Sequence, residues 1–250
     1  MMLRSFALVA ALGLVPRPVF PTAAPAIVTA RDGVTIAADV YAGSSPIAPV
    51  ILLFHQGGSG KAEYAPIAPR LVLLGYNAIA IDQRAGGDLY SPPNATVARL
   101  GHSAPYLDVL RDMDATFAYA RRLFPSAPVY VWGSSYSASL AIAFAAKHPH
   151  DVAAVLAFSP GEYFKNKHFV RNAARAIRVP VFIDSASDAG EERAARKIGD
   201  ALRSKFKVDF VPHAGVHGSS TLRDDKNAAG AAENWDAVTG FLARVRALEP

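Results

Sequence analysis

Short continuous runs of apolar residues alternate along the chain with longer segments in which apolar residues recur every three or four positions. The continuous runs predict buried strands, and the helical spacing predicts amphipathic helices. Strands separated by helices predict β-α-β units, and therefore a mostly parallel sheet with helices on both faces. The expected strands are residues 26–30, 35–41, 50–55, 77–82, 129–132, 152–158, 181–183 and 207–211, and the expected helices are residues 62–74, 106–124, 136–148, 191–205 and 233–248.

The first two expected strands are joined by a short turn rather than by a helix. The turn is Arg31-Asp32-Gly33, and Asp-Gly is a strong signal for a tight hairpin, so we expect an antiparallel hairpin at one edge of the sheet. Residues 84–105 are polar and rich in Gly and Pro, which predicts a long loop. The connection between residues 159 and 180 is too short for a separate lid domain. The sequence therefore predicts one α/β domain over residues 27–250.

The first 26 residues have the pattern of a secretory signal peptide. A positively charged start up to Arg4 precedes an apolar stretch, and Ala24-Pro25-Ala26 supplies a small-x-small cleavage pattern. The apolar stretch is shorter than the roughly 20 residues that span a bilayer, so no stable membrane insertion is expected. An uncleaved N-terminus or a misassigned start is the alternative. The pattern predicts a secreted or periplasmic protein with residues 1–26 removed.

Composition narrows the possible functions. The chain has 250 residues, of which 51% are hydrophobic, and a net charge of +5, which together exclude intrinsic disorder. It contains no cysteine, which excludes disulfides, cysteine-bound zinc and a cysteine nucleophile. The basic residues are scattered rather than gathered in one run, so no nucleic-acid partner is expected.

The segment from Val129 to Ser137 carries the strongest chemical signal in the sequence. An apolar strand is followed by Gly133-Ser134-Ser135-Tyr136-Ser137 and then by an Ala-rich helix. Gly-x-Ser-x-small between a strand and a helix is typical of a nucleophile elbow, in which a strained turn raises the serine hydroxyl above the sheet. Ser135 is the predicted nucleophile and Ser134 is the alternative. A polar helix N-terminus without catalytic chemistry is the other interpretation.

With this elbow the chain resembles the α/β-hydrolase family, and within it the lidless dienelactone-hydrolase-like and small serine esterase members. The resemblance covers residues 27–248, although Ser137 stands where a second glycine is usual. It implies an α/β-hydrolase fold with an eight-stranded, mostly parallel sheet and a catalytic triad in the order Ser, acid, His. The turn from Asp82 to Arg84 also resembles a family feature, and these two side chains are expected to brace loops.

The remaining triad members are sought after the later strands. The resemblance places the acid about five residues past the strand at 181–183, where Asp188 stands. Asp184 is the alternative, and Asp188 could instead cap the next helix. The base belongs in the loop after the last strand, where His217 precedes a glycine and His213 is the alternative. In this prediction the histidine takes the proton of the serine, and Asp188 orients the imidazole.

The negative charge that develops on the substrate requires two backbone N–H donors. The amide of Tyr136, directly after the nucleophile, is the first expected donor. The second belongs to the loop after the strand at 50–55, where the resemblance favours Gly57, with Gln56 next. This glycine-rich loop lacks the Gly-Lys-Ser/Thr ending of a phosphate-binding loop. Tyr163 follows a strand end, where ligand-facing residues gather, and is either a pocket-lining residue or an ordinary half-buried tyrosine.

Together these features predict a serine hydrolase that cleaves a carboxylic ester or lactone of a small molecule through an acyl-enzyme intermediate. No metal or organic cofactor is signalled, and the expected partner is the small-molecule ester substrate. A serine peptidase-like hydrolase and a catalytically silent hydrolase fold used for binding are the alternatives. The sequence gives no indication of oligomeric state.

Overall fold

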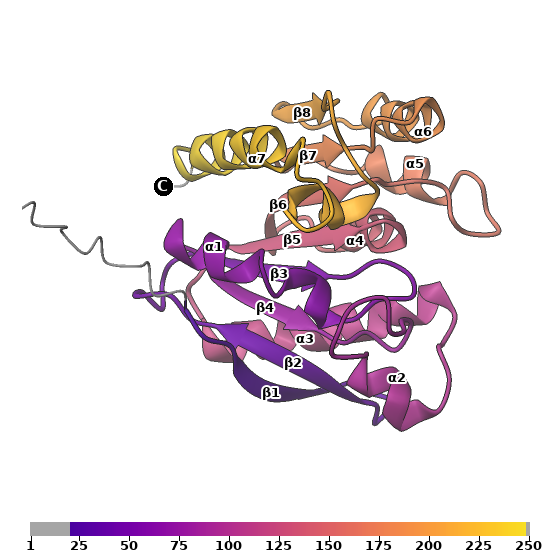
Figure 1. Cartoon of the computed structure of the whole chain (residues 1–250). Coiled ribbons are helices and arrows are strands. Elements are labelled where there is room, and N and C mark those ends of the chain that lie inside the picture. The colour runs from indigo at the N-terminus through magenta and orange to yellow at the C-terminus, as the bar shows by residue number, and fades with distance from the viewer. Residues whose placement is uncertain (1–20, 249–250) are drawn as a thin grey trace, which may run out of the picture.

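One twisted sheet of eight strands organises the chain (Figure 1). The computed structural model describes residues 21–248. The strand order is β1-β2-β4-β3-β5-β6-β7-β8; β1 pairs with β2 and β2 with β4 in antiparallel fashion, and every other pair is parallel. The predicted α/β-hydrolase architecture with an N-terminal hairpin is confirmed. The strands are β1 (Ala24–Thr29), β2 (Thr35–Tyr41), β3 (Val50–Phe54), β4 (Asn77–Ile81), β5 (Val129–Ser134), β6 (Val152–Phe158), β7 (Val181–Asp184) and β8 (Lys207–Phe210).

Helices cover both faces of the sheet and bury two separate cores. Alternate residues of a strand point to opposite faces, so Leu52 of β3 joins one core and Leu53 joins the other. The first core lies against α3, α4, α5 and α6, and the second lies against α1 and α7. The helices are α1 (Ala68–Leu73), α2 (Ala95–Leu100), α3 (Leu110–Leu123), α4 (Tyr136–Lys147), α5 (Phe169–Ala174), α6 (Ala189–Gly199) and α7 (Ala231–Arg246), with 3-10 turns η1 (Lys61–Tyr64), η2 (Tyr106–Val109) and η3 (Gly218–Leu222).

Several predicted segments differ from the structure. The helix expected over residues 106–124 is divided into η2 and α3, and the one expected over residues 191–205 ends at Gly199. The helix expected over residues 62–74 is divided into η1 and α1, because Pro66 and Pro69 interrupt the backbone hydrogen bonds of one continuous helix. The expected loop 84–105 contains α2, which the side chain of Asn94 caps by accepting from Val97 N at 2.8 Å. The connection after residue 159 contains the short helix α5.

The N-terminal prediction falls mostly outside the described residues. Of the predicted signal peptide, the last residues, Ala24 to Ala26, lie in β1 and pair with residues 38–40 of β2. Cleavage after Ala26 would therefore remove the first three residues of β1. Within residues 21–248, no helix is long and apolar enough to cross a membrane.

Candidate active site

The loops that carry the predicted site residues leave the carboxyl ends of β3, β5, β6 and β7, and the histidine loop follows β8. Ser135 stands between β5 and α4 with φ 60° and ψ −124°, a left-handed conformation that a side chain rarely adopts. Its amide donates to the Phe158 carbonyl at 2.8 Å, which fixes the turn to the neighbouring strand. A Cβ at Gly133 would overlap the Ser137 carbonyl, so glycine is required there. The sharp turn predicted from the sequence is present at Ser135.

The two neighbouring serines of the elbow have different environments. Ser135 is 8% exposed, and its hydroxyl interacts with the phenol of Tyr163. Ser134 is completely buried and donates its hydroxyl to Glu63 Oε1 at 2.7 Å. The geometry therefore favours Ser135 over Ser134 as the residue that a substrate could reach.

His217 pairs with a glutamate of α6. Its Nδ1 lies 2.8 Å from Glu191 Oε1, and both side chains are partly exposed. Burial raises the pKa of Glu191, but hydrogen bonds from His217 and Ser159 outweigh it, so the pKa is lowered overall. Because an ionised carboxylate only accepts hydrogen bonds, His217 Nδ1 carries the proton and Nε2 is left as the basic atom.

The expectation that Asp188 orients the imidazole is wrong. Asp188 caps α6, and its Oδ1 accepts from Gly190 N at 2.8 Å and Glu191 N at 3.1 Å. An aspartate directly before a helix satisfies the free amides of the first turn, and within the described chain the hydrogen bonds of the Asp188 carboxylate are to these amides and not to His217. Glu191 lies one turn further along α6, and sequence reasoning missed it. The available signal was a second carboxylate within reach of the same loop.

The alternative acid, Asp184, and the alternative base, His213, lie in different surroundings. Asp184 ends β7 with both carboxylate oxygens buried and without a hydrogen-bond partner in the described chain, and burial raises its pKa well above the usual range. His213 has a 96% exposed side chain and pairs with Glu233 of α7 at 2.7 Å. Within the described chain, no hydrogen bond joins either residue to His217 or to the Glu191 side chain.

Backbone bonds join the histidine loop to the strand ends. Ser159 follows β6 and is, with Ser135, one of two non-glycine residues with positive φ in the described chain. Its amide donates to the Asp184 carbonyl at 2.8 Å, and its Oγ accepts from Gly218 N at 2.9 Å. The strained backbone at Ser159 therefore holds the residue that follows His217.

Of the two residues expected in the loop after β3, only Gly57 keeps a free amide. Gln56 N donates to Glu63 Oε2 at 2.9 Å, so the proposal of Gln56 as an oxyanion donor is wrong. The Gly57 amide has no acceptor in the described chain. Tyr136 is the first residue of α4, so its amide has no acceptor within the helix. Gly57 and Tyr136 thus remain the candidate donors.

A buried histidine holds this loop in place. His55 Nδ1 donates to the Gln56 carbonyl at 2.8 Å, and Nε2 accepts from Gln83 N at 3.0 Å. Burial lowers the pKa of His55 to about 4, so the ring is neutral and can make both bonds. The role predicted for the turn after β4 is confirmed: Asp82 accepts from Lys61 N and Ala95 N, and Arg84 bonds Asp112 and Asp32.

Two tyrosines flank the elbow. Tyr106 stacks on the ring of Tyr136 with centroids 3.9 Å apart, and a Cβ at Gly57 would come within 2.6 Å of its Oη. Tyr163 donates its hydroxyl to the Ser159 carbonyl at 2.8 Å. Both are 39% exposed. Tyr163 therefore lies beside the elbow as a pocket-lining residue would, and Tyr106 is a wall residue that the sequence analysis missed.

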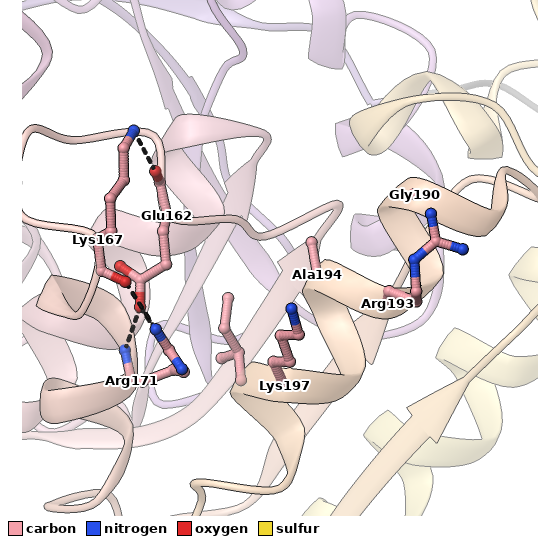
Figure 2. Close-up of a pocket in the computed structure, with 8 residues that line it drawn as sticks. Glu162, Lys167, Arg171, Gly190, Arg193, Ala194 and Lys197 are labelled. Carbon is pink, nitrogen blue, oxygen red and sulfur yellow. Dashed lines mark hydrogen bonds and ion pairs between the residues drawn. The ribbon is translucent and has the colours of Figure 1, made fainter.

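A cationic cleft of about 310 Å³ borders the site between α6 and the segment that leads into α5 (Figure 2). Four basic side chains line it, and its one acid, Glu162, is already paired with Arg171 at 3.2 Å. Glu162 and Gly190 in its lining directly adjoin Tyr163 and Glu191 in the chain. The cleft gives this side of the site a positive potential. The basic residues are Lys167, Arg171, Arg193 and Lys197.

Within residues 21–248, no cluster of three or more histidine or acidic side chains could hold a metal ion. Figure 1 shows the elements that meet at the site: the end of β5 with α4, the β6 and β7 loops, and α6. A strained serine and a carboxylate-paired histidine thus lie on separate loops at one end of the parallel sheet, an arrangement similar to that of serine hydrolase sites.

Comparison with known proteins agrees with this arrangement. Residues 45–207 match the family described as Serine aminopeptidase, S33. The chain therefore belongs to this family of α/β hydrolases. No curated protein sequence matches the chain.

Several solved structures share the fold at low sequence identity. Est1E from Butyrivibrio proteoclasticus, solved with ferulic acid, aligns with a TM-score of 0.70 and 14% identity over 89% of this chain and 99% of that one. The Pyrococcus furiosus esterase Pf2001 aligns with a TM-score of 0.63 and 18% identity over 90% and 93%. A dienelactone hydrolase from Anabaena variabilis aligns with a TM-score of 0.62 and 14% identity over 76% and 85%.

Proposed function

We propose that this protein is a serine esterase that hydrolyses carboxylic esters or lactones of small molecules, with Ser135, His217 and Glu191 as its triad. The single observation that supports this most strongly is the pairing of His217 Nδ1 with Glu191 at 2.8 Å, on a loop that is bonded to the elbow of the strained Ser135 through Ser219 N and Ser134 Oγ. The named esterases and the dienelactone hydrolase among the similar structures point in the same direction.

In the proposed reaction, His217 Nε2 removes the proton of Ser135 as Oγ attacks the ester carbonyl carbon. The carbonyl oxygen becomes an oxyanion that accepts from the amides of Gly57 and Tyr136, each worth about 2.7–4 kcal/mol of transition-state stabilisation. The imidazolium, stabilised by Glu191, returns the proton to the leaving alkoxide as the carbon–oxygen bond breaks. Water activated by His217 then attacks the acyl-enzyme, and the acid leaves as Ser135 recovers its proton.

The test is hydrolysis of p-nitrophenyl esters from acetate to decanoate by the wild-type protein, Ser135→Ala and the control Ser126→Ala, together with fluorophosphonate labelling. Ser126 is an exposed serine outside the site. We expect turnover and labelling to be lost in Ser135→Ala and kept in Ser126→Ala. Equal turnover in the wild type and Ser135→Ala would contradict the proposal. No turnover and no labelling in the wild type would favour a binding protein instead.

The family description favours peptidase activity as the second candidate function. Amides and esters share the acyl-enzyme route, and they differ in the proton that the leaving amine requires. Comparison of kcat/KM for an aminoacyl p-nitroanilide with that for the matching p-nitrophenyl ester separates the two. Because the activated ester is intrinsically the more reactive of the two, the decisive result is anilide cleavage itself: hydrolysis of the anilide that is lost in Ser135→Ala would identify a peptidase, and cleavage of the ester alone would favour an esterase.

We further propose that the leader of residues 1–26 directs export. N-terminal sequencing of protein secreted from a host that expresses the full chain tests this, and a mature start near residue 27 is expected. Protein retained in the cytoplasm with Met1 intact would contradict it.

A further inference from the structure

The carboxylate of Glu63 is fully buried beneath the site, and the proposed reaction does not use it. It stands on η1, between β3 and α1. Its Oε2 accepts from Gln56 N at 2.9 Å, and its Oε1 accepts from Ser134 Oγ at 2.7 Å. A buried carboxylate is costly unless its oxygens are hydrogen-bonded, and here both are.

A third loop joins this network through Ser134. The Ser134 Oγ, while donating to Glu63, accepts from Ser219 N at 2.8 Å. A second link connects the outer loops, since Gln56 Nε2 donates to Ser220 Oγ at 3.1 Å. Glu63 thereby connects the loop after β3, the elbow and the histidine loop.

Each anchored group lies next to a group that the proposed reaction requires. Gln56 directly precedes Gly57, Ser134 directly precedes Ser135, and Ser219 follows His217 by two residues. A shift in any one bond would move an oxyanion donor, the nucleophile or the base. Catalysis is sensitive to such shifts, because a misplacement of about 1 Å can reduce the rate about 100-fold.

On the basis of the proposed function, we propose that Glu63 is a positioning residue. Its ionised carboxylate fixes the positions of the oxyanion loop, the nucleophile and the catalytic histidine relative to one another. A carboxylate accepts from both Gln56 N and Ser134 Oγ. A carboxylic acid carries a proton on one oxygen and has to break or reverse one of these bonds. The ionised form is therefore the one that matches the observed network.

The surroundings make this ionisation accessible near neutral pH. Burial raises the pKa of Glu63 to about 7, and the bonds from Ser134 and Gln56 and the charge of Arg223 oppose the rise. The Arg223 guanidinium, which follows η3, donates to the Glu63 carbonyl at 2.9 Å. The other titratable groups that interact with the carboxylate are tyrosines, which stay neutral in this range: Tyr64 on η1, Tyr90 on the loop before α2 and Tyr136 on α4.

The test compares the wild type with Glu63→Gln, Ser134→Ala and the double variant, by kcat and KM for p-nitrophenyl acetate from pH 5 to 9. Glutamine keeps the size of the side chain and one acceptor but cannot accept from both donors. We expect kcat to fall at least about 10-fold with KM within about 2-fold, because only the alignment of reacting groups changes. The double variant is expected to be no worse than Glu63→Gln, since both changes remove the same link.

The pH profile separates positioning from a merely structural role. In the wild type, kcat is expected to rise as Glu63 ionises, with a pKa of about 7, and Glu63→Gln is expected to lack that rise. The control Asp236→Asn, at an exposed carboxylate of α7, is expected to retain the wild-type profile. A wild-type kcat and pH profile in Glu63→Gln would overturn the positioning role.

Three further outcomes are decisive. Should Glu63→Gln fail to fold, Ser134→Ala decides alone: a wild-type kcat overturns the proposal, and a reduced kcat at unchanged KM supports it. A wild type that neither turns over esters nor labels at Ser135 overturns the proposed function and the positioning role together. A wild type that is active with an indistinguishable Glu63→Gln overturns the positioning role only.

Discussion

The buried carboxylate of Glu63 should make the protein less stable as pH rises, and Glu63→Gln should remove this dependence. Burial raises its pKa from 4.5 to about 7. The folded protein therefore binds this proton more tightly than the unfolded chain does. The contribution of this raised pKa to the stability of the folded protein is fully present below pH 4.5 and is lost as pH rises through 7.

The size of the effect follows from the pKa difference. A difference of about 2.5 units at about 1.36 kcal/mol per unit corresponds to roughly 3 kcal/mol of unfolding free energy. For a domain of this size that is about 6–12 °C in Tm, at about 2–4 °C per kcal/mol. Glutamine does not titrate, so Glu63→Gln should lack this part of the pH dependence.

The assay is denaturant unfolding of both proteins, followed by circular dichroism, from pH 4.5 to 8.5. Burial also raises the pKa of Asp112 and Asp184, but these residues are common to both proteins and cancel in the difference. We expect the stability of Glu63→Gln relative to the wild type to rise by roughly 3 kcal/mol across this range. Curves that stay parallel within about 0.5 kcal/mol would refute the reasoning, because linkage requires the difference wherever the pKa is raised.

Three other predictions concern single residues. Glu191→Gln should lower kcat about 1,000-fold or more, because the imidazole of His217 loses its carboxylate partner. Asp188→Asn preserves a helix cap and should change kcat less than about 3-fold. Similar losses for the two variants in an ester assay would contradict the assignment of Glu191 as the triad acid. Asp184→Asn should raise the Tm at pH 8 by at least about 3 °C, because it removes a buried carboxylate without partners, and a lower Tm would show an undetected stabilising contact. Gly133→Ala should lower the free energy of unfolding by about 3 kcal/mol or prevent folding, since the added Cβ would overlap the Ser137 carbonyl. An unchanged Tm in calorimetry would contradict this.

Features encoded in short stretches of chain were predictable. The buried runs of β3 to β6 and the turn of the β1–β2 hairpin follow from periodicity and turn chemistry. The elbow at Ser135 was also predictable, because its strand, glycine, serine and helix are contiguous. The helix α2 was missed although Asn94 and Gly101 mark its two ends, because the polar and glycine-rich surroundings indicated a loop.

Contacts between distant segments were not predictable in the same way. The sequence prediction chose Asp188, with Asp184 as the alternative, and did not consider Glu191, which lies three residues after Asp188. The direction in which the first turn of α6 faces the histidine loop decides between them, and the local cap bond of Asp188 removes it from consideration.

The α/β-hydrolase fold and the serine at its elbow can be predicted from the sequence, because both depend on residue patterns within single elements. The pairing of Glu191 with His217, the bond that occupies Gln56 N, and the link that Glu63 makes between three loops are visible only in the folded chain. These outcomes depend on hydrogen bonds between segments from 7 to 85 residues apart. Such bonds form only where the sheet brings its strand ends together, and no local pattern records their direction.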